Sequence, residues 1–152
     1  MSLDFDKYAA KGNELVNMLA DDLVVPRDNA GRIMRAVLHA LRKRLTLEES
    51  FQLMSQLPMA LKGVYIEGWK IPTTTKRIIH LKEFLDEIRN EDGLTAGYDF
   101  GNDERTKIAV SGVFRTLNFY ISKGEMEDII GVLPNEIKKF VQSTIGEKRA
   151  VL

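Results

Sequence analysis

Histidines and paired carboxylates are the side chains of this sequence that could carry acid–base or metal chemistry. The two histidines, His39 and His80, have no HExxH motif and no second histidine one helical turn away. Adjacent carboxylates occur at Asp21-Asp22, Asp86-Glu87 and Glu91-Asp92. Neighbouring residues on a helix point in different directions, so none of these pairs forms an acid–base dyad on its own. We therefore predict no metal site and no catalytic residue among these side chains.

Motifs for phosphate binding and nucleophilic catalysis are also absent from the sequence. It contains no GxxxxGK[ST] loop, no GxGxxG between a strand and a helix, and no G-x-S-x-G nucleophile elbow. It contains no cysteine, which excludes disulfides, thiolate metal sites and cysteine nucleophiles. We therefore expect no cofactor, and a non-catalytic protein is favoured over an enzyme.

Three arginines in one predicted helix are the first candidate binding residues. Arg32, Arg35 and Arg42 fall opposite the apolar arc of that helix at 100° per residue. Such a stripe could contact the phosphates of a nucleic acid, or it could be an ordinary solvated helix face. The helix that follows lacks basic residues for a major groove, and the net charge of the chain is zero.

Tyr65 and Trp69 are the second group of candidate binding residues. Trp69 is the only tryptophan, and it stands between a predicted helix and a predicted linker. Tyrosine and tryptophan dominate the hot spots of protein interfaces, so an exposed Trp69 would anchor a partner. A Trp69 that folds back would instead fill the seam between two halves of the chain. The sequence leaves both interpretations open.

Charge is segregated along the chain. Residues 27–44 carry six basic side chains and one acidic, whereas residues 81–103 carry two basic and seven acidic. Three arrangements fit this pattern. The two segments are solvated faces, or they form a dipolar surface that attracts a charged partner or a second copy, or they face each other inside the fold.

The sequence also repeats, with an offset of 76 residues, as between Pro58 and Pro134. Thr46 and Ser122 occupy equivalent positions and are each followed three residues later by glutamate, the pattern of a helix capping box. We therefore predict one domain over residues 1–152, built from two similar helical halves. These halves are expected at about 4–70 and 76–146, with residues 70–75 as the linker between them.

Apolar residues recur at helical spacing nearly throughout, which predicts an all-α bundle of about seven or eight helices. Helices are expected over residues 4–22, 30–44 and 76–90, in segments that begin at Thr46 and Pro58, and in three segments between 103 and 145. Asp28 or Asn29 is expected to cap the second helix. Residues 91–102 contain three glycines and are expected to form a loop, and the tail 146–152 is expected to fray.

The two long helices of the predicted halves differ in polarity. The 30–44 helix is expected to have one core face and one solvent-facing side. Its counterpart from residue 103 is more apolar all round, and Phe119 and Tyr120 stand where the first half has Lys43 and Arg44. We expect the counterpart to lie centrally between the halves, or to present its extra apolar face to a partner. The predicted shared core comprises Leu19, Val37, Leu38, Leu41, Leu53, Leu57, Leu61, Phe84, Ile88, Val113, Leu117, Ile129 and Leu133.

Composition narrows the class of protein further. Of 152 residues, 44% are hydrophobic and 29% are charged, with 22 basic and 22 acidic side chains, as in ordinary globular domains. No run approaches the length of a membrane-spanning segment, and the first residues lack the basic and apolar regions of a secretion signal. These features favour a cytoplasmic protein that does not enter a membrane.

Several short motifs carry a resemblance to a known family. They are Tyr8-Ala9-Ala10-Lys11-Gly12-Asn13, Pro26-Arg27-Asp28, Leu57-Pro58-Met59-Ala60-Leu61-Lys62-Gly63, Gly68-Trp69 and Leu133-Pro134. Together they resemble the bacterial family catalogued as domain of unknown function 2267, over most of the chain. The resemblance implies small bacterial proteins with an all-helical fold. It implies no established activity, cofactor or catalytic residue, so we carry over no functional site.

The sequence supports three functional hypotheses. The first is a non-catalytic protein-interaction or regulatory module that binds another protein or itself. The second is a nucleic-acid-binding protein that uses the face of Arg32, Arg35 and Arg42. The third is a small-ligand binder or enzyme with a pocket between the two halves. The residues predicted to bind are the three arginines together with Tyr65 and Trp69.

Overall fold

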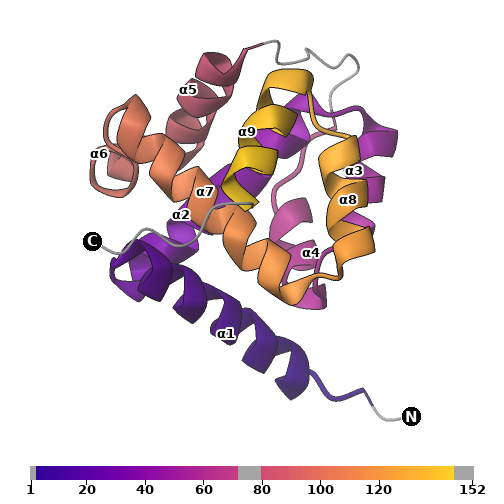
Figure 1. Ribbon diagram of the computed structural model, residues 1–152. Helices are drawn as coiled ribbons and strands as arrows, with labels where there is room; N and C mark the ends of the chain where they lie inside the picture. The colour runs from indigo at the N-terminus through magenta and orange to yellow at the C-terminus, as the bar shows by residue number, and fades with distance from the viewer. Residues whose placement is uncertain (1–2, 72–79, 146–152) are drawn as a thin grey trace.

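The computed structural model describes residues 3–71 and 80–145, and every regular element in these ranges is helical (Figure 1). In chain order the elements are α1 (Asp6–Leu23), α2 (Arg27–Arg44), α3 (Leu47–Ser55), α4 (Met59–Ile66), α5 (Leu81–Asp92), the 3-10 turn η1 (Gly93–Thr95), α6 (Ala96–Asp99), α7 (Asp103–Tyr120), α8 (Lys123–Gly131) and α9 (Asn135–Ile145). Within the described ranges, eight of these helices have eight or more residues. The predicted all-α bundle is confirmed.

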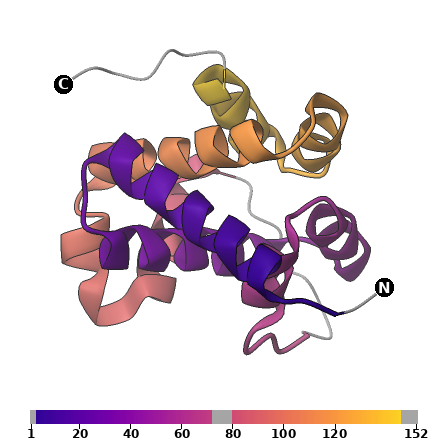
Figure 2. The same ribbon diagram turned by 90° about the horizontal axis from the view of Figure 1, so that it is seen from below.

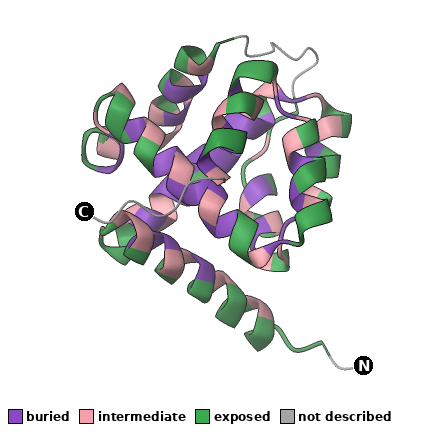
Figure 3. Cartoon of the chain, viewed as in Figure 1, coloured by how far each residue is buried: buried purple, intermediate pink, exposed green. Residues whose placement is uncertain are grey.

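One apolar core joins these helices. All thirteen residues predicted for the core are buried, and they belong to one cluster with members in each of the eight longer helices. Figure 3 shows that buried residues gather where helices meet, while exposed residues cover the outer faces. Burial of this apolar surface is the main stabilising contribution to the fold.

Helices α2 and α7 both lie at the centre of the bundle. Helices α1, α4, α5, α6 and α7 all pack against α2. Ten of its eighteen residues are buried, compared with eight of eighteen in α7. The expectation that α7 lies centrally is confirmed, because it packs against α1 and α2 as well as α5, α8 and α9. The expected solvent-facing side of α2 is wrong at two residues. The reason is that His39 and Arg42, on the polar side of α2, are buried through hydrogen bonds to backbone carbonyls.

The helices α2–α4 and α7–α9 have starting points that match at the 76-residue offset. The first three begin at Arg27, Leu47 and Met59, and the second three begin at Asp103, Lys123 and Asn135. Both predicted capping boxes are confirmed, because Glu49 N donates to Thr46 Oγ1 and Glu125 N donates to Ser122 Oγ, each at 3.1 Å. The repeat of whole halves stays a prediction, because the helices that precede these two sets differ in length. Helix α1 has eighteen residues and α5 has twelve.

Two predicted local features differ from the structure. Helix α2 begins directly after Pro26, and neither Asp28 nor Asn29 caps it with a side chain. Proline can occupy this position because its fixed φ suits the entry to a helix. Residues 91–102 are not a loop throughout, since α5 extends to Asp92 and residues 93–99 form η1 and α6. The expected helix start at residue 76, the linker residues 72–75 and the tail 146–152 lie outside the described residues.

Two glycines allow α1 to approach its neighbours closely. A Cβ atom at Gly12 would lie 2.9 Å from the Cβ of Ala60 in α4. A Cβ atom at Gly112 of α7 would lie 2.7 Å from Cδ2 of Leu23, at the end of α1. Seen from below, α1 crosses the molecule in contact with both α2 and α7 (Figure 2). The α1–α7 contact therefore joins the first part of the chain to the last.

Candidate functional site

The basic helix α2 and the acidic helix α5 face each other inside the fold. Lys43 Nζ lies 3.3 Å from a carboxylate oxygen of Glu87 and 2.5 Å from one of Glu91. Arg44 also pairs with Glu87, at 3.5 Å. Of the three arrangements left open by the charge pattern, mutual compensation is therefore confirmed. These charges are used within the molecule.

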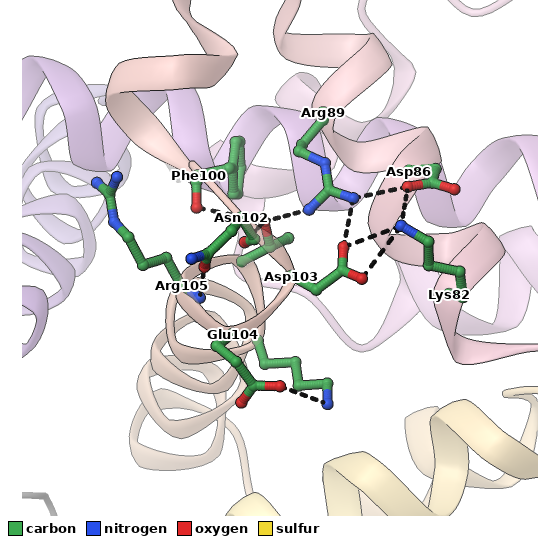
Figure 4. A network of polar contacts seen from close by, with 10 residues as sticks. Lys82, Asp86, Arg89, Phe100, Asn102, Asp103, Glu104 and Arg105 are labelled. Carbon is green, nitrogen blue, oxygen red and sulfur yellow. Dashed lines mark hydrogen bonds and ion pairs between the residues drawn. The ribbon is translucent and has the colours of Figure 1, made fainter.

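A second polar network joins Asp86 of α5 to Asp103 of α7 through two basic side chains (Figure 4). Arg89 Nη2 lies 2.6 Å from Asp86 and 2.6 Å from Asp103, and Lys82 Nζ lies 3.1 Å from each of the same two carboxylates. Arg89 Nη1 also donates to Thr106 Oγ1 at 2.7 Å. The network fastens the start of α7 to α5, and its exposed ion pairs contribute little stability individually.

Arg32, Arg35 and Arg42 do not form a common binding face. Arg32 donates to both carboxylate oxygens of Asp99, at 2.8 Å and 3.0 Å. Arg35 is half-exposed and lies 3.7 Å from Glu67, whereas Arg42 is only 7% exposed. The predicted stripe of solvent-facing arginines is therefore wrong at Arg42, because the backbone of α4 takes its guanidinium out of solvent.

The polar side of α2 caps the C-terminal end of α4. Arg42 Nη1 donates to the carbonyl oxygens of Tyr65 and Glu67, at 2.7 Å and 2.6 Å. His39 Nε2 lies 2.8 Å from the carbonyl oxygen of Val64. Burial lowers the pKa of His39, so the imidazole is neutral at pH 7, and Nε2 must carry the proton because a carbonyl only accepts. Carbonyls at a helix end have no donor within the helix, so these contacts supply what α4 lacks.

Tyr65 and Trp69 pack against each other and do not form an exposed pair. Tyr65 is buried, its hydroxyl lies 2.7 Å from Ser50 Oγ, and burial raises its pKa to about 12. The half-buried ring of Trp69 meets Tyr65 and Phe51 edge-on, at centroid distances of 5.6 Å and 6.4 Å. The interpretation that Trp69 folds back is confirmed. Both ring contacts of Trp69 are to α3 and α4 of the first half, and neither is to the second half.

Asp92 and Asp99 bring two carboxyl groups together where α5 meets α6. Burial, and then the adjacent carboxylate of Asp99, raise the pKa of Asp92 to about 6. Burial also acts on Asp99, but its hydrogen bonds from Arg32 outweigh this and lower the pKa of Asp99. No sequence pattern indicated this pair, since the two residues lie in a segment predicted to be a loop. The Asp99 side chain is fully buried and bound by Arg32, so we interpret the pair as structural.

Replacing Asp92 with asparagine should stabilise the protein at neutral pH. Because the folded-state pKa of Asp92 is raised, its contribution to stability is present at low pH and is lost as pH rises from about 4 to about 6. The asparagine side chain would stay neutral and could still donate to Asp99. We expect a gain of about 1 kcal/mol at pH 7, after allowance for solvent screening, and none at pH 4. Urea unfolding at both pH values measures this, and an equal effect at both would contradict it.

A groove of about 710 Å³ lies between α1 and α7, at the contact between the two parts of the chain. Its lining comprises Glu14, Asn17, Met18, Asp21 and Asp22 of α1, and Arg115, Thr116, Phe119 and Tyr120 of α7. One wall thus carries three carboxylates, and the other carries two aromatic rings and one guanidinium. Neither Tyr65 nor Trp69 lines this groove, and none of the three predicted arginines does.

Several of the polar groups in the groove bind one another across it. Arg115 Nη2 donates to Asp22 Oδ2 at 2.8 Å. Burial, and then the carboxylate of Glu14 that accepts from its hydroxyl, raise the pKa of Tyr120. Lys11 Nζ lies 5.9 Å from the centroid of the Tyr120 ring, a cation–π distance. The groove therefore has an aromatic end near Glu14 and an ionic end near Asp22.

Two polar atoms of the groove have no hydrogen-bond partner among the described residues. They are Arg115 Nε and Thr116 Oγ1, both fully buried, and Thr116 as a whole is 2% exposed. An unsatisfied buried donor costs about 1–3 kcal/mol. Because both atoms are closed to solvent, they are not open to an occupant of the groove.

Part of this groove had a signal in the sequence. The exchange of Lys43 and Arg44 for Phe119 and Tyr120 between the halves pointed to an extra apolar face on α7, and Phe119 is 70% exposed there. The Arg115–Asp22 pair had no such signal, because 93 residues separate its members. The groove is our candidate site.

The comparisons with known proteins place the chain in a family without assigning it an activity. The family model described as "Uncharacterized conserved protein (DUF2267)" matches residues 12–140. Among curated proteins, none matches the chain. Within the described residues, no group of three or more histidine or carboxylate side chains could hold a metal ion. No helix in the described part of the chain combines the length and apolar character needed to cross a bilayer.

Proposed function

We propose, from the premise that the chain belongs to the DUF2267 family of uncharacterized conserved proteins, that it is a non-catalytic, cytoplasmic protein-interaction module. Its docking site would be the groove between α1 and α7. The family description assigns no activity, so the groove itself supports this function.

The exposed ring of Phe119 is the observation that carries this proposal. An aromatic side chain that is 70% exposed, in a groove beside carboxylates, leaves apolar surface in water that a partner would cover. Aromatic anchors set in a polar rim are typical of interface hot spots. The ionisable groups of the groove also bind each other, Arg115 with Asp22 and Tyr120 with Glu14, which suits recognition better than proton transfer.

The other two hypotheses have weaker support. Nucleic-acid binding would have to depend on Arg35, since Arg32 is bound to Asp99 and Arg42 is buried. A small-ligand site has one specific observation in its favour, the groove of about 710 Å³ between the two parts of the chain.

Replacing Phe119 with serine should abolish recovery of the partner when the tagged protein is used for affinity capture from a nuclease-treated lysate. Tyr98→Ser is the matched control, because Tyr98 is an exposed aromatic residue outside the groove. Mass spectrometry should identify a stoichiometric protein that the unchanged chain and Tyr98→Ser recover and Phe119→Ser does not. Both variants should melt at the same temperature as the unchanged protein.

Equal recovery by both variants would contradict the proposed function. Recovery that nuclease treatment removes, and that Arg35→Glu prevents, would establish the nucleic-acid hypothesis in its place.

A further inference from the structure

We propose that the first part of the chain carries a pocket for a small carboxylate with an apolar body, such as an aromatic or branched aliphatic acid. This pocket is separate from the groove between α1 and α7, because no residue lines both. Three properties of the pocket point to this class of ligand: its apolar lining, the arginines around it and a glycine that leaves its centre open.

The pocket lies where α1, α2 and α4 meet. These three helices pack against one another in pairs, and a space of about 320 Å³ is left between them. Its apolar lining comprises Val16 of α1, Met34 of α2, and Leu61 and Val64 of α4. Ligand pockets in proteins generally measure about 300–1,000 Å³ and are lined mainly by apolar side chains with a few polar groups. The space is therefore of the size that suits a small molecule.

Three guanidinium groups and one carboxylate line the same pocket. They belong to Arg27, Arg32, Arg35 and Asp28, all in the first half of α2. The charge of Arg32 is used within the fold, because the buried carboxylate of Asp99 accepts two hydrogen bonds from it. Arg27 and Arg35 remain as the groups that could attract an anion into the pocket.

Arg27 keeps part of its guanidinium available to a ligand. Its Nε donates to the side-chain oxygen of Asn17 at 3.0 Å, and its Nη2 donates to that of Asn13 at 2.5 Å. Both acceptors are neutral, and Arg27 forms no ion pair within the described part of the chain. The two amides therefore hold the guanidinium in place without neutralising it. The edge formed by Nη1 and the second N–H of Nη2 has no acceptor among the described residues, and a carboxylate can accept from both nitrogens of such an edge.

Arg35 supplies a second cation at the other end of the pocket. It stands eight residues after Arg27, so the two lie on one side of α2 and about 12 Å apart along its axis. Arg35 pairs only with Glu67, at 3.7 Å, and both side chains are at least half-exposed. An exposed ion pair of this kind contributes little stability, so an anionic ligand could draw Arg35 away from Glu67 at small cost.

Gly31 leaves room for the ligand between the two arginines. It lies four residues from each of them, inside α2, and it lines the pocket. A Cβ atom at Gly31 would meet no neighbouring group within 4 Å, and its φ is not positive, so neither close packing nor backbone conformation requires glycine here. Glycine inside a helix costs about 0.5–1 kcal/mol relative to alanine. What this glycine provides is an open centre of the pocket.

Three small probes test this inference on the full, isotope-labelled chain by NMR titration. Cinnamate has both the apolar body and the carboxylate, acetate has only the carboxylate, and cinnamyl alcohol has only the apolar body. At low salt we expect cinnamate to shift the amide signals of Gly31 and Val64 until they saturate. Acetate and cinnamyl alcohol should each bind at least about tenfold more weakly, and added salt should weaken the binding of cinnamate.

Filling the pocket should abolish the binding of cinnamate. Gly31→Leu places a side chain in the open space, and Val64 then reports whether cinnamate still binds. Gly124→Leu is the matched control, because Gly124 is also a helical glycine with open space at its Cβ position and lies outside the pocket. It should leave the affinity unchanged. Neither substitution should lower the melting temperature, because leucine has the higher helix propensity.

Asn13→Asp tests the charge of Arg27 while keeping its guanidinium. The aspartate would retain an acceptor for Nη2 but would add the carboxylate that Arg27 lacks. We expect cinnamate to bind about tenfold more weakly and cinnamyl alcohol to bind as before. The melting temperature should not fall, because the contact between α1 and Arg27 is kept.

Four results would overturn the inference. They are no saturable shift with cinnamate, equal affinity for cinnamate and cinnamyl alcohol, binding that persists in Gly31→Leu, and an affinity that Asn13→Asp leaves unchanged. Phe119→Ser removes the aromatic anchor of the other groove and should leave cinnamate binding as it is, whereas a loss would place the ligand there and contradict the pocket. The titration and the capture experiment therefore succeed or fail separately.

Discussion

Replacing Arg42 with alanine should lower the free energy of unfolding by about 3 kcal/mol. The guanidinium donates to the carbonyl oxygens of Tyr65 and Glu67 at the end of α4, and alanine would leave both without that donor. The aliphatic stem of Arg42, buried within the bundle, would also be lost. Urea unfolding at pH 7, followed by circular dichroism, measures the change.

Arg35→Ala is the matched control for this substitution. It removes the same residue type from the same helix, but Arg35 is half-exposed and its ion pair with Glu67 spans 3.7 Å. We expect its effect to stay within about 0.5 kcal/mol. Arg42→Lys keeps the charge but lacks the planar fork that reaches two carbonyls, so its effect should lie between the two. If Arg42→Ala cost no more than Arg35→Ala, the capping role would be wrong, and the guanidinium would again be a candidate for binding.

The helices and the core could be predicted because their signals are local. Apolar residues at three- and four-residue steps mark the buried side of each helix, and the core residues chosen from this pattern are all buried. Thr46 and Ser122 satisfy backbone donors within their own first turn, so a pattern four residues long was enough to predict both capping boxes.

The role of the polar side of α2 could not be predicted in the same way. Helical periodicity gives the angle at which Arg42 leaves the helix, but not which backbone group lies in that direction. Its partners, at Tyr65 and Glu67, are 23 and 25 residues away along the chain. A row of arginines opposite an apolar arc is typical of a solvated face. In this protein the C-terminal end of α4, rather than solvent, lies against part of that face.

The candidate site depends even more on distant contacts. Arg115 meets Asp22 across 93 residues, and the two residues become neighbours only because Gly112 lets α1 approach α7. The exposed ring of Phe119 was the one part with a sequence signal, because the equivalent residue of the first half is a lysine. Differences between similar halves are therefore a useful guide to function here. Features that the halves share, such as the two capping boxes, stabilise the helices of the fold.

Replacing Arg32 with alanine should lower the thermal midpoint by about 8 °C at pH 8 and by much less at pH 5. The carboxylate of Asp99 is fully buried and accepts two hydrogen bonds from Arg32, so the substitution leaves a buried charge next to Asp92 without its cation. In the unchanged protein the lowered pKa of Asp99 gives stability that is present above the unfolded-state pKa and is lost as pH falls. Without Arg32 the pKa of Asp99 should rise, so protonation at pH 5 would neutralise the charge and narrow the deficit.

The double variant Arg32→Leu with Asp99→Leu separates a pairing role from a binding role. If Arg32 serves chiefly to neutralise Asp99, removing both charges should restore most of the midpoint that Arg32→Leu alone loses, and the loss should no longer depend on pH. If the double variant stayed as unstable as the single one, the guanidinium would have a role beyond Asp99. That result would again favour a nucleic-acid-binding role for Arg32. In the present structure the buried carboxylate of Asp99 binds Arg32 at 2.8 Å, so the guanidinium is not available to a phosphate.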